Sequence, residues 1–299
     1  MFEPMTAVSP APTSQRDLAH PDRREPHIID VLIAERAPKL SASPAWPLVR
    51  PLLYALLDYR KARRMADTIA PLPGRTALEH VSDLLALEVR ARGMERVPST
   101  GRLIVVCNHP TGIADGVAVY DALKAVRPDL VFYANADAHR VAPRFGEVLI
   151  PVEWVEAKRT RETARRTLHE TREAMAAERC LVVFPAGRIA RRRPNGGLAD
   201  PPWAPTAVSL ARKYEAAVLP IHLAGPWSRL FHLFHRVSGE LRDITLFHEL
   251  LNKRGQAFQL TIGPPIPPQA LSGEAATLSL DLKAYVETRL PAEPDRPFP

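Results

Sequence analysis

The stretch Leu103–Gly116 reads LIVVCNHPTGIADG and indicates both the fold class and the place of a site. Its first five residues, Leu103–Cys107, are apolar on both faces and mostly β-branched, which is typical of a strand buried in a parallel or mixed sheet. The run ends at the Asn-His-Pro sequence 108–110, and a helical pattern begins soon after Asp115. A His and an Asp just past a buried strand lie where ligands bind in open α/β sheets.

His109 is the residue type that most often serves as a general base near neutral pH. A carboxylate on its other ring nitrogen, here Asp115, would fix the tautomer and stabilise the imidazolium that forms. Such a pair can take a proton from a hydroxyl or an amine as that group attacks a thioester. The same residues also suit a loop histidine and a helix N-cap. The stretch alone leaves both interpretations open.

Composition bounds the possible partners and compartment. The 299 residues suffice for one large domain or two small ones, and the net charge of +7 predicts an anionic partner such as a phosphate or a lipid surface. Nucleic acid is not expected, because the basic residues are not interleaved with aromatic ones. Cys107 and Cys180 adjoin apolar runs and are expected to be reduced core residues, and no Cys/His spacing predicts a metal site.

The N-terminus lacks the apolar region of a signal peptide, and no segment reaches ~18 uninterrupted apolar residues. We therefore expect a cytoplasmic protein without a transmembrane helix, peripherally associated with the inner face of the membrane. A serine hydrolase is excluded because the sequence has no GxSxG elbow.

Alternating strand and helix patterns predict an α/β domain with a mostly parallel mixed sheet flanked by helices, preceded by an N-terminal helical segment. The expected strands are Leu87–Ala91, Leu103–Cys107, Leu130–Ala134, Val148–Val152, Cys180–Phe184, Val218–Leu223 and Phe258–Ile262. The expected helices of the core are Val117–Val126, Arg159–Ala177, Thr206–Tyr214, Val237–Leu251 and Leu278–Leu290.

The predicted organisation is a single domain with extensions at both ends. Residues 1–40 form a disordered or loosely ordered leader that includes a short helix over 28–37. Residues 41–290 form the domain, with N-terminal helices over 41–86 and the α/β core over 87–290. Residues 291–299 form a tail. Within the N-terminal helices, Thr76–Leu85 is expected to begin with a capping box made by Thr76 and Glu79.

The longest expected N-terminal helix is Leu48–Ile69. Its first half is apolar and begins beside Trp46, and its second half carries four basic residues, Arg60, Lys61, Arg63 and Arg64. An apolar face with an aromatic flank and a basic cluster is typical of a helix that lies on an anionic membrane surface. A core-packing helix with a solvated basic end has the same pattern, so both interpretations stay open.

A second chemical loop follows the strand run that ends at Phe184. It reads Pro185-Ala-Gly-Arg188, with three more arginines at 191–193. Arginines past a strand end can clamp a phosphate with bidentate hydrogen bonds, and Gly187 would let the backbone approach the ligand closely. A basic surface loop is the alternative. His222, later in the chain, alternates with apolar residues and is expected to be a core histidine.

Four blocks in a fixed order resemble the glycerolipid acyltransferase superfamily, which includes the lysophosphatidate acyltransferases. They are the Gly-x-Glu-x-x-Pro sequence within Leu87–Pro98, the Asn-His…Asp block up to Asp115, the FPAG turn 184–187 and the VLPI sequence 218–221. The likeness covers about residues 85–268. The Pro after the His, the FPAG turn and the segment Ser238–Ile266 are most similar to the hemolysin-like or ornithine-lipid-type branch.

Two departures from the family pattern bear on function. Five residues separate His109 from Asp115 where the family has four, so the loop must bring Asp115 back under His109, which Gly112 makes feasible. Ala186 stands where the family has a Glu associated with the acceptor. This change weakens the expectation that glycerol 3-phosphate or lysophosphatidate is the acceptor.

The resemblance implies an O-acyltransferase of phospholipid or membrane lipid biosynthesis. It would move a fatty acyl group from acyl-CoA or acyl-carrier protein to a hydroxyl, or an amine, of a lyso-lipid or related polar lipid, without a further cofactor. His109 would be the general base and Asp115 its orienting partner. The residues expected to bind substrate are Asn108, Thr111, Gly112, Phe184, Pro185, Gly187, Arg188, Arg191 and Arg192.

Backbone N–H groups at Thr111 and Gly112 are the expected donors to an oxyanion. The alternative function is a non-catalytic lipid- or membrane-surface-binding protein on the same scaffold. Whether the side chains of His109 and Asp115 lie within hydrogen-bond reach distinguishes the two interpretations.

Overall fold

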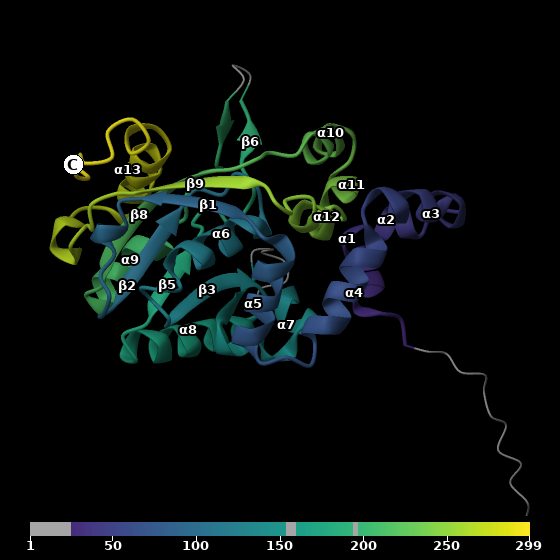
Figure 1. The fold of residues 1–299 in the computed structure, drawn as a ribbon, viewed down its shortest axis with the longest axis horizontal. Coiled ribbons are helices and arrows are strands. Elements are labelled where there is room, and N and C mark those ends of the chain that lie inside the picture. Colours follow the sequence, from purple (N-terminus) through teal and green to yellow (C-terminus); the bar gives the residue numbers. More distant parts are fainter. Residues whose placement is uncertain (1–24, 154–159, 194–196) are drawn as a thin grey trace, which may run out of the picture.

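The computed structural model describes residues 25–153, 160–193 and 197–299, and in these ranges a seven-stranded sheet forms the centre of the molecule (Figure 1). The strand order is β1-β9-β8-β2-β5-β3-β4. The strands are β1 (Glu88–Arg92), β2 (Leu103–Cys107), β3 (Leu130–Asn135), β4 (Leu149–Val152), β5 (Cys180–Val183), β8 (Ala217–Ala224) and β9 (Ala257–Ile262). Neighbours pair in parallel except β8 and β9, so the predicted mostly parallel mixed sheet is confirmed.

Strand β2 is buried on both faces, as its apolar sequence predicts. Leu103, Val105 and Cys107 join the core beneath α5 (Gly74–Leu85) and α6 (Ile113–Leu123). Ile104 and Val106 join the opposite core, beneath α8 (Arg161–Ala176), α9 (Thr206–Tyr214) and α13 (Ala275–Ala284). All five side chains are 0 % exposed. Packing on both faces fixes the direction in which the chain leaves the sheet after Cys107.

Both cysteines are buried with free thiols, as expected. Burial raises the pKa of Cys180 to about 12 and that of Cys107 well above its ordinary value, so both thiols stay protonated near neutral pH. They act as small apolar core residues.

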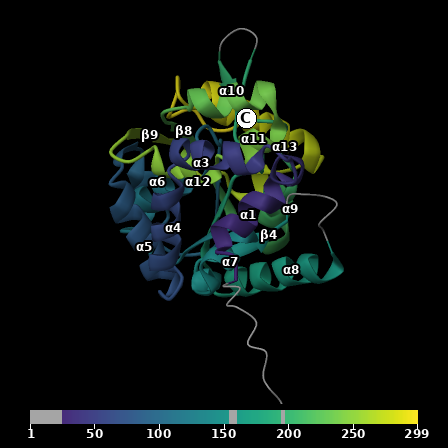
Figure 2. The same ribbon diagram turned by 90° about the vertical axis from the view of Figure 1, so that its right-hand side faces the viewer.

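The N-terminal helices α1 (Ile28–Arg36), α2 (Pro38–Ser41), α3 (Trp46–Leu56) and α4 (Tyr59–Ile69) pack at one side of the sheet (Figures 1 and 2). Helix α1 buries Ile29 and Leu32 in the main core. The short helix expected over 28–37 is therefore present as α1, and its apolar side chains pack in the core. Residues 1–24 lie outside the described residues.

Several helix boundaries differ from the prediction. The expected helix over 48–69 is two helices, because Asp58 adopts a left-handed conformation between α3 and α4. The expected helix over 237–251 is replaced by α10 (Arg229–Val237), α11 (Gly239–Asp243) and α12 (Leu246–Leu251), with the Ser238 hydroxyl accepting from the backbone at the start of α11. Helix α13 continues into a π-helical turn, Tyr285–Arg289.

The expected capping box of α5 is also wrong. The helix begins at Gly74, and the Glu79 carboxylate accepts from the Tyr120 hydroxyl (2.6 Å) and the Lys124 ammonium (2.8 Å) of α6. Tertiary partners therefore override the local capping pattern. Across the three described ranges, no helix is both long enough and apolar enough for a membrane crossing.

Arg127 ties together the turns that lead into the central strands. It is 0 % exposed, and its guanidinium donates to the carbonyls of Pro98 (3.0 Å), Gly101 (2.9 Å) and Glu178 (3.2 Å). It also pairs with Asp129 at 2.6 Å.

We predict that Arg127→Ala lowers the free energy of unfolding by about 2–4 kcal/mol, because three carbonyls and a carboxylate lose a buried partner. Urea unfolding followed by circular dichroism measures the change. Arg172→Ala, on the exposed face of α8, is the control and should stay within about 0.5 kcal/mol of wild type. Equal stability of the two variants would contradict the prediction.

Candidate active site

The structure brings His109 and Asp115 together at the C-terminal end of β2. His109 Nδ1 lies 2.9 Å from Asp115 Oδ2, and the two side chains are 18 % and 0 % exposed. The carboxylate belongs to the first turn of α6, the helix that follows β2. The two residues are thus within hydrogen-bond reach, as a general-base pair requires.

The Asp115 carboxylate has a full set of donors. Its Oδ2 also accepts from the backbone N–H groups of Thr111 (2.9 Å) and Gly112 (3.0 Å), and its Oδ1 accepts from the Thr111 hydroxyl (2.5 Å). These N–H and O–H groups are all donors, so the Asp115 oxygens accept each of these hydrogen bonds. An acceptor oxygen at Nδ1 favours a proton on that nitrogen and leaves Nε2 of His109 as the basic atom.

The five-residue spacing fits because of Gly112. This residue has φ = +101°, and a Cβ there would lie 2.9 Å from the Ile189 side chain. The conformation and the close approach both favour glycine. It allows α6 to begin at Ile113, earlier than the expected start at residue 117, and so places Asp115 beneath the imidazole.

Three residues expected to bind substrate have their polar groups engaged within the protein. The Asn108 amide donates to the Leu223 carbonyl (2.8 Å) and accepts from the Leu223 N–H (2.7 Å), which fastens β2 to β8. The N–H groups of Thr111 and Gly112 both donate to Asp115. The expectation that these two N–H groups serve an oxyanion is therefore wrong, because the carboxylate already occupies them.

The FPAG turn contacts the base from the neighbouring strand β5. The Phe184 ring lies 4.5 Å from the His109 ring, centroid to centroid. Pro185 is buried and Gly187 closes the turn with φ = +61° and a 2.9 Å hydrogen bond from its N–H to the Phe184 carbonyl. Ala186 packs against an apolar cluster. A Glu at this position would therefore border apolar side chains.

The arginines of this segment differ in environment. Arg188 and Arg192 are exposed, and the Arg192 guanidinium lies 5.1 Å from the Trp227 ring centroid. Arg191 is half-buried, 5.2 Å from the Phe231 ring centroid, and its Nη1 finds no hydrogen-bond partner in the described part of the chain. Burial and the nearby Arg242 and Arg188 lower the pKa of Arg191. A negatively charged ligand group would relieve this repulsion.

The sequence did not single out Asp200, Trp227 or Phe231. Asp200 accepts from the backbone N–H of His109, and the two aromatic residues provide the surfaces on which Arg191 and Arg192 stack. Asp200 stands in the Pro-rich sequence Asp-Pro-Pro-Trp (200–203), which contains no local signal for a contact with His109.

Two other histidines, His222 and His232, have environments that do not suit a general base. His222 Nδ1 lies 2.9 Å from the Val286 carbonyl oxygen, and burial lowers its pKa, as for a satisfied core histidine. Burial and the nearby arginines 191 and 192 lower the pKa of His232 to about 4, so it is neutral near pH 7. In the described ranges, His, Cys, Asp and Glu side chains form no group of three or more suited to a metal ion.

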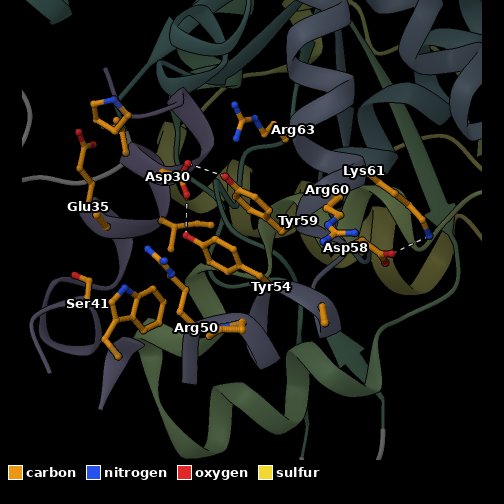
Figure 3. A pocket seen from close by; sticks show the side chains of 17 residues that line it. Asp30, Glu35, Ser41, Arg50, Tyr54, Asp58, Tyr59, Arg60, Lys61 and Arg63 are labelled. Atoms are coloured by element: carbon orange, nitrogen blue, oxygen red, sulfur yellow. Dashed lines mark hydrogen bonds and ion pairs between the residues drawn. The ribbon is translucent and has the colours of Figure 1, made fainter. Parts of the chain in front are cut away.

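A large cavity lies away from these residues, between α1, α3 and α4 (Figure 3). Its volume is about 1360 Å³. The stacked rings of Tyr54 and Tyr59 face it, with centroids 4.0 Å apart, and both hydroxyls donate to Asp30 (2.9 and 2.7 Å). Basic side chains of Arg50 and Arg63 line its walls. None of the expected site residues lines this cavity.

Comparison with known proteins shows which proteins the part of the chain that carries the site is similar to. Residues 88–224 match the Acyltransferase family model. The chain is 29% identical over 202 residues to a lyso-glycine lipid O-acyltransferase of Phocaeicola vulgatus, covering 64% of this chain and 69% of that protein. It is 27% identical over 198 residues to a lyso-glycine lipid O-acyltransferase of Bacteroides thetaiotaomicron, covering 64% and 71%.

Among solved structures, the 1-acyl-sn-glycerophosphate acyltransferase PlsC from Thermotoga maritima matches with a TM-score of 0.47 and 15% identity, over 88% of this chain and 98% of that one. The family match spans β1 to β8 and contains the His109–Asp115 pair and the FPAG turn. Over residues 88–224 the chain is thus similar to the Acyltransferase family, and both relatives are named as O-acyltransferases, which supports the resemblance to the glycerolipid acyltransferase superfamily.

Proposed function

We propose that the protein transfers a fatty acyl group from a thioester, acyl-CoA or acyl-carrier protein, to the hydroxyl of a lyso-lipid, with His109 as the general base. The observation that supports this most is the 2.9 Å contact between His109 Nδ1 and the buried Asp115 carboxylate, which leaves Nε2 for the acceptor. A non-catalytic relative would have no need to keep this pair in contact, so the geometry favours catalysis.

The reaction needs no covalent acyl-enzyme. The acceptor oxygen attacks the thioester carbonyl carbon while its proton moves to His109 Nε2. The tetrahedral intermediate then breaks the C–S bond, and the leaving thiolate takes the proton from the imidazolium. Asp115 keeps the ring oriented and stabilises its positive charge throughout. Proximity of the two substrates and the base provides the remaining acceleration.

For the acceptor we propose a lyso-lipid with an anionic headgroup, such as an amino acid carboxylate. Both relatives are named as enzymes of lyso-glycine lipid, and a glycine joined to a lipid through its nitrogen keeps a free carboxylate. Arg191, with an unpartnered Nη1 among the described residues, and the exposed Arg188 can provide bidentate donors to such a group. Ala186, in place of the family Glu, removes a negative charge that would oppose it.

We predict that His109→Ala lowers kcat/KM by about 10²–10⁴-fold, because the acceptor loses its general base. Asp115→Asn should cause a loss of similar order, because an amide can donate to Nδ1 and favours the wrong tautomer. Thioester consumption with a lyso-glycine lipid acceptor measures both. His169→Ala, an exposed histidine of α8, is the matched control. Activity of His109→Ala within a few-fold of the control would rule out this mechanism.

We predict that Arg191→Met raises KM for an anionic lyso-lipid by about tenfold, because one charge-assisted contact is lost, and leaves KM for the acyl donor unchanged. Arg165→Met, on α8, is the control for loss of one positive charge. Steady-state kinetics with each substrate varied in turn give both constants. A rise in the donor KM instead would assign Arg191 to the acyl donor.

We also propose that the protein acts at an anionic membrane surface, on the cytoplasmic face. Helix α3 exposes Leu48 (84 %), Leu52 (72 %) and Leu56 (47 %), which lie on one face at a spacing of four residues. The following helix, α4, carries exposed arginines at 60, 63 and 64. Apolar side chains beside basic ones suit insertion among acidic headgroups.

We predict that the double substitution Leu48→Ser and Leu52→Ser weakens binding to phosphatidylglycerol vesicles by at least about tenfold, since two apolar side chains no longer enter the bilayer. Vesicle co-sedimentation at two salt concentrations measures this. The matched control replaces Leu168 and Leu280, which are exposed on α8 and α13, by Ser. An equal loss in the two double variants would refute the assignment to α3.

A further inference from the structure

One hairpin and the residues that flank it bind both the N–H and the carbonyl group of His109. Strands β6 (Arg191–Arg192) and β7 (Leu198–Ala199) pair in antiparallel fashion after the FPAG turn. Directly before β6, the Ala190 N–H donates to the His109 carbonyl at 2.8 Å. Directly after β7, the Asp200 carboxylate accepts from the His109 N–H, with Oδ1 at 3.1 Å and Oδ2 at 3.2 Å.

Asp200 is built into this position. It is 6 % exposed, and its Oδ2 accepts from the Trp203 indole N–H at 2.9 Å. Its own backbone N–H donates to Glu287 Oε1 at 2.6 Å. Glu287 is in turn paired with Lys283 at 2.6 Å and with Arg193 at 3.5 Å. Glu287, in the π-helical turn Tyr285–Arg289, therefore holds the backbone of Asp200, and Asp200 in turn holds the backbone of His109.

The Asp200 carboxylate contacts His109 and is not neutralised by an ion pair within the described residues. In the described part of the chain, no arginine or lysine pairs with its carboxylate, and its neighbours are the N–H groups of His109 and Trp203. Burial raises its pKa to about 6, while the hydrogen bonds from Trp203 and His109 and the charge of His109 act in the opposite direction. Glu287 is the nearby acidic group and raises the same pKa. Asp200 is therefore mostly ionised above neutral pH.

A buried carboxylate beside the base is useful when positive charge appears on the imidazole. During the proposed transfer the proton of the acceptor moves to His109, and fixed negative charge nearby stabilises the imidazolium without reorganisation. The Asp115 carboxylate supplies negative charge at Nδ1, and Asp200 adds a second carboxylate at the backbone N–H of His109. The same hairpin carries Arg191 and Arg192, so headgroup recognition and placement of the base share one element.

We propose that Asp200 is a positioning residue of the acyl transfer, which holds the His109 main chain and favours the imidazolium through its negative charge. The inference rests on the proposed role of His109 as general base. It extends that role to a residue 91 positions away in the sequence.

The test compares Asp200→Asn with Asp129→Asn. Asp129 is a matched control, because its carboxylate also accepts a backbone N–H, that of Cys180 at 3.0 Å, and a side-chain donor, Arg127, but lies at the other end of β5. We expect Asp200→Asn to lower kcat by about 10- to 100-fold, with KM for both substrates within about threefold. Asp129→Asn lowers the unfolding midpoint but leaves kcat per folded molecule unchanged.

Two further readouts separate positioning from a merely structural role. In Asp200→Asn the acid limb of kcat/KM moves to lower pH, because the imidazolium has lost a stabilising charge. The NMR titration of the His109 ring, assigned with His109→Ala, shifts in the same direction and needs no turnover. In Asp129→Asn both are unchanged.

The outcomes are distinct. A wild-type enzyme that transfers no acyl group to any lyso-lipid contradicts the proposed function, while the ring titration still reports on Asp200. A His109 titration that is the same in wild type and Asp200→Asn overturns the inference, whatever the rate. A lowered kcat with both pH readouts shifted supports it.

Discussion

The buried carboxylate of Asp115 is the group on which the rest of the site depends. A fully buried charge is tolerated only when donors surround it, and Asp115 has two backbone N–H groups, a hydroxyl and the His109 ring. This arrangement requires Gly112 in a left-handed conformation and a helix that begins directly after it. It also requires β2 to be packed on both faces, because only a fixed strand end presents His109 at a constant position.

The site draws on more of the chain than the family match covers. The match ends at residue 224, yet Trp227 and Phe231 support the arginines, and Glu287 holds the backbone of Asp200. Loops after β2, β5 and β8 meet because these strands are parallel neighbours. His109, the arginines and the aromatic residues that stack on them therefore come from three different loops. Glu287, near the C-terminus, holds the loop that carries Asp200 through a hydrogen bond to its backbone.

The sequence predicted what depends on local pattern. Runs such as Leu103–Cys107 identified the strands, and the ordered blocks identified His109 and Asp115 as the central pair. The sequence did not predict features that depend on distant contacts or on an unusual backbone conformation. Glu79 binds side chains of α6 and does not cap its own helix. The left-handed conformation of Asp58 divides a helix that the periodicity predicted to be continuous. Asp200 could not be predicted, because nothing in a Pro-rich loop indicates a contact with a residue so far away in the chain. The domain boundary at residue 290 and the bound substrates stay predictions.

The most direct test of the account is the tautomer of His109, which long-range ¹H–¹⁵N NMR on histidine-labelled protein reads without any substrate. The account predicts a neutral ring protonated at Nδ1, with Nε2 unprotonated and ready to accept a proton. A ring protonated at Nε2 would contradict it, because the atom that faces the acceptor would then be a donor and not a base.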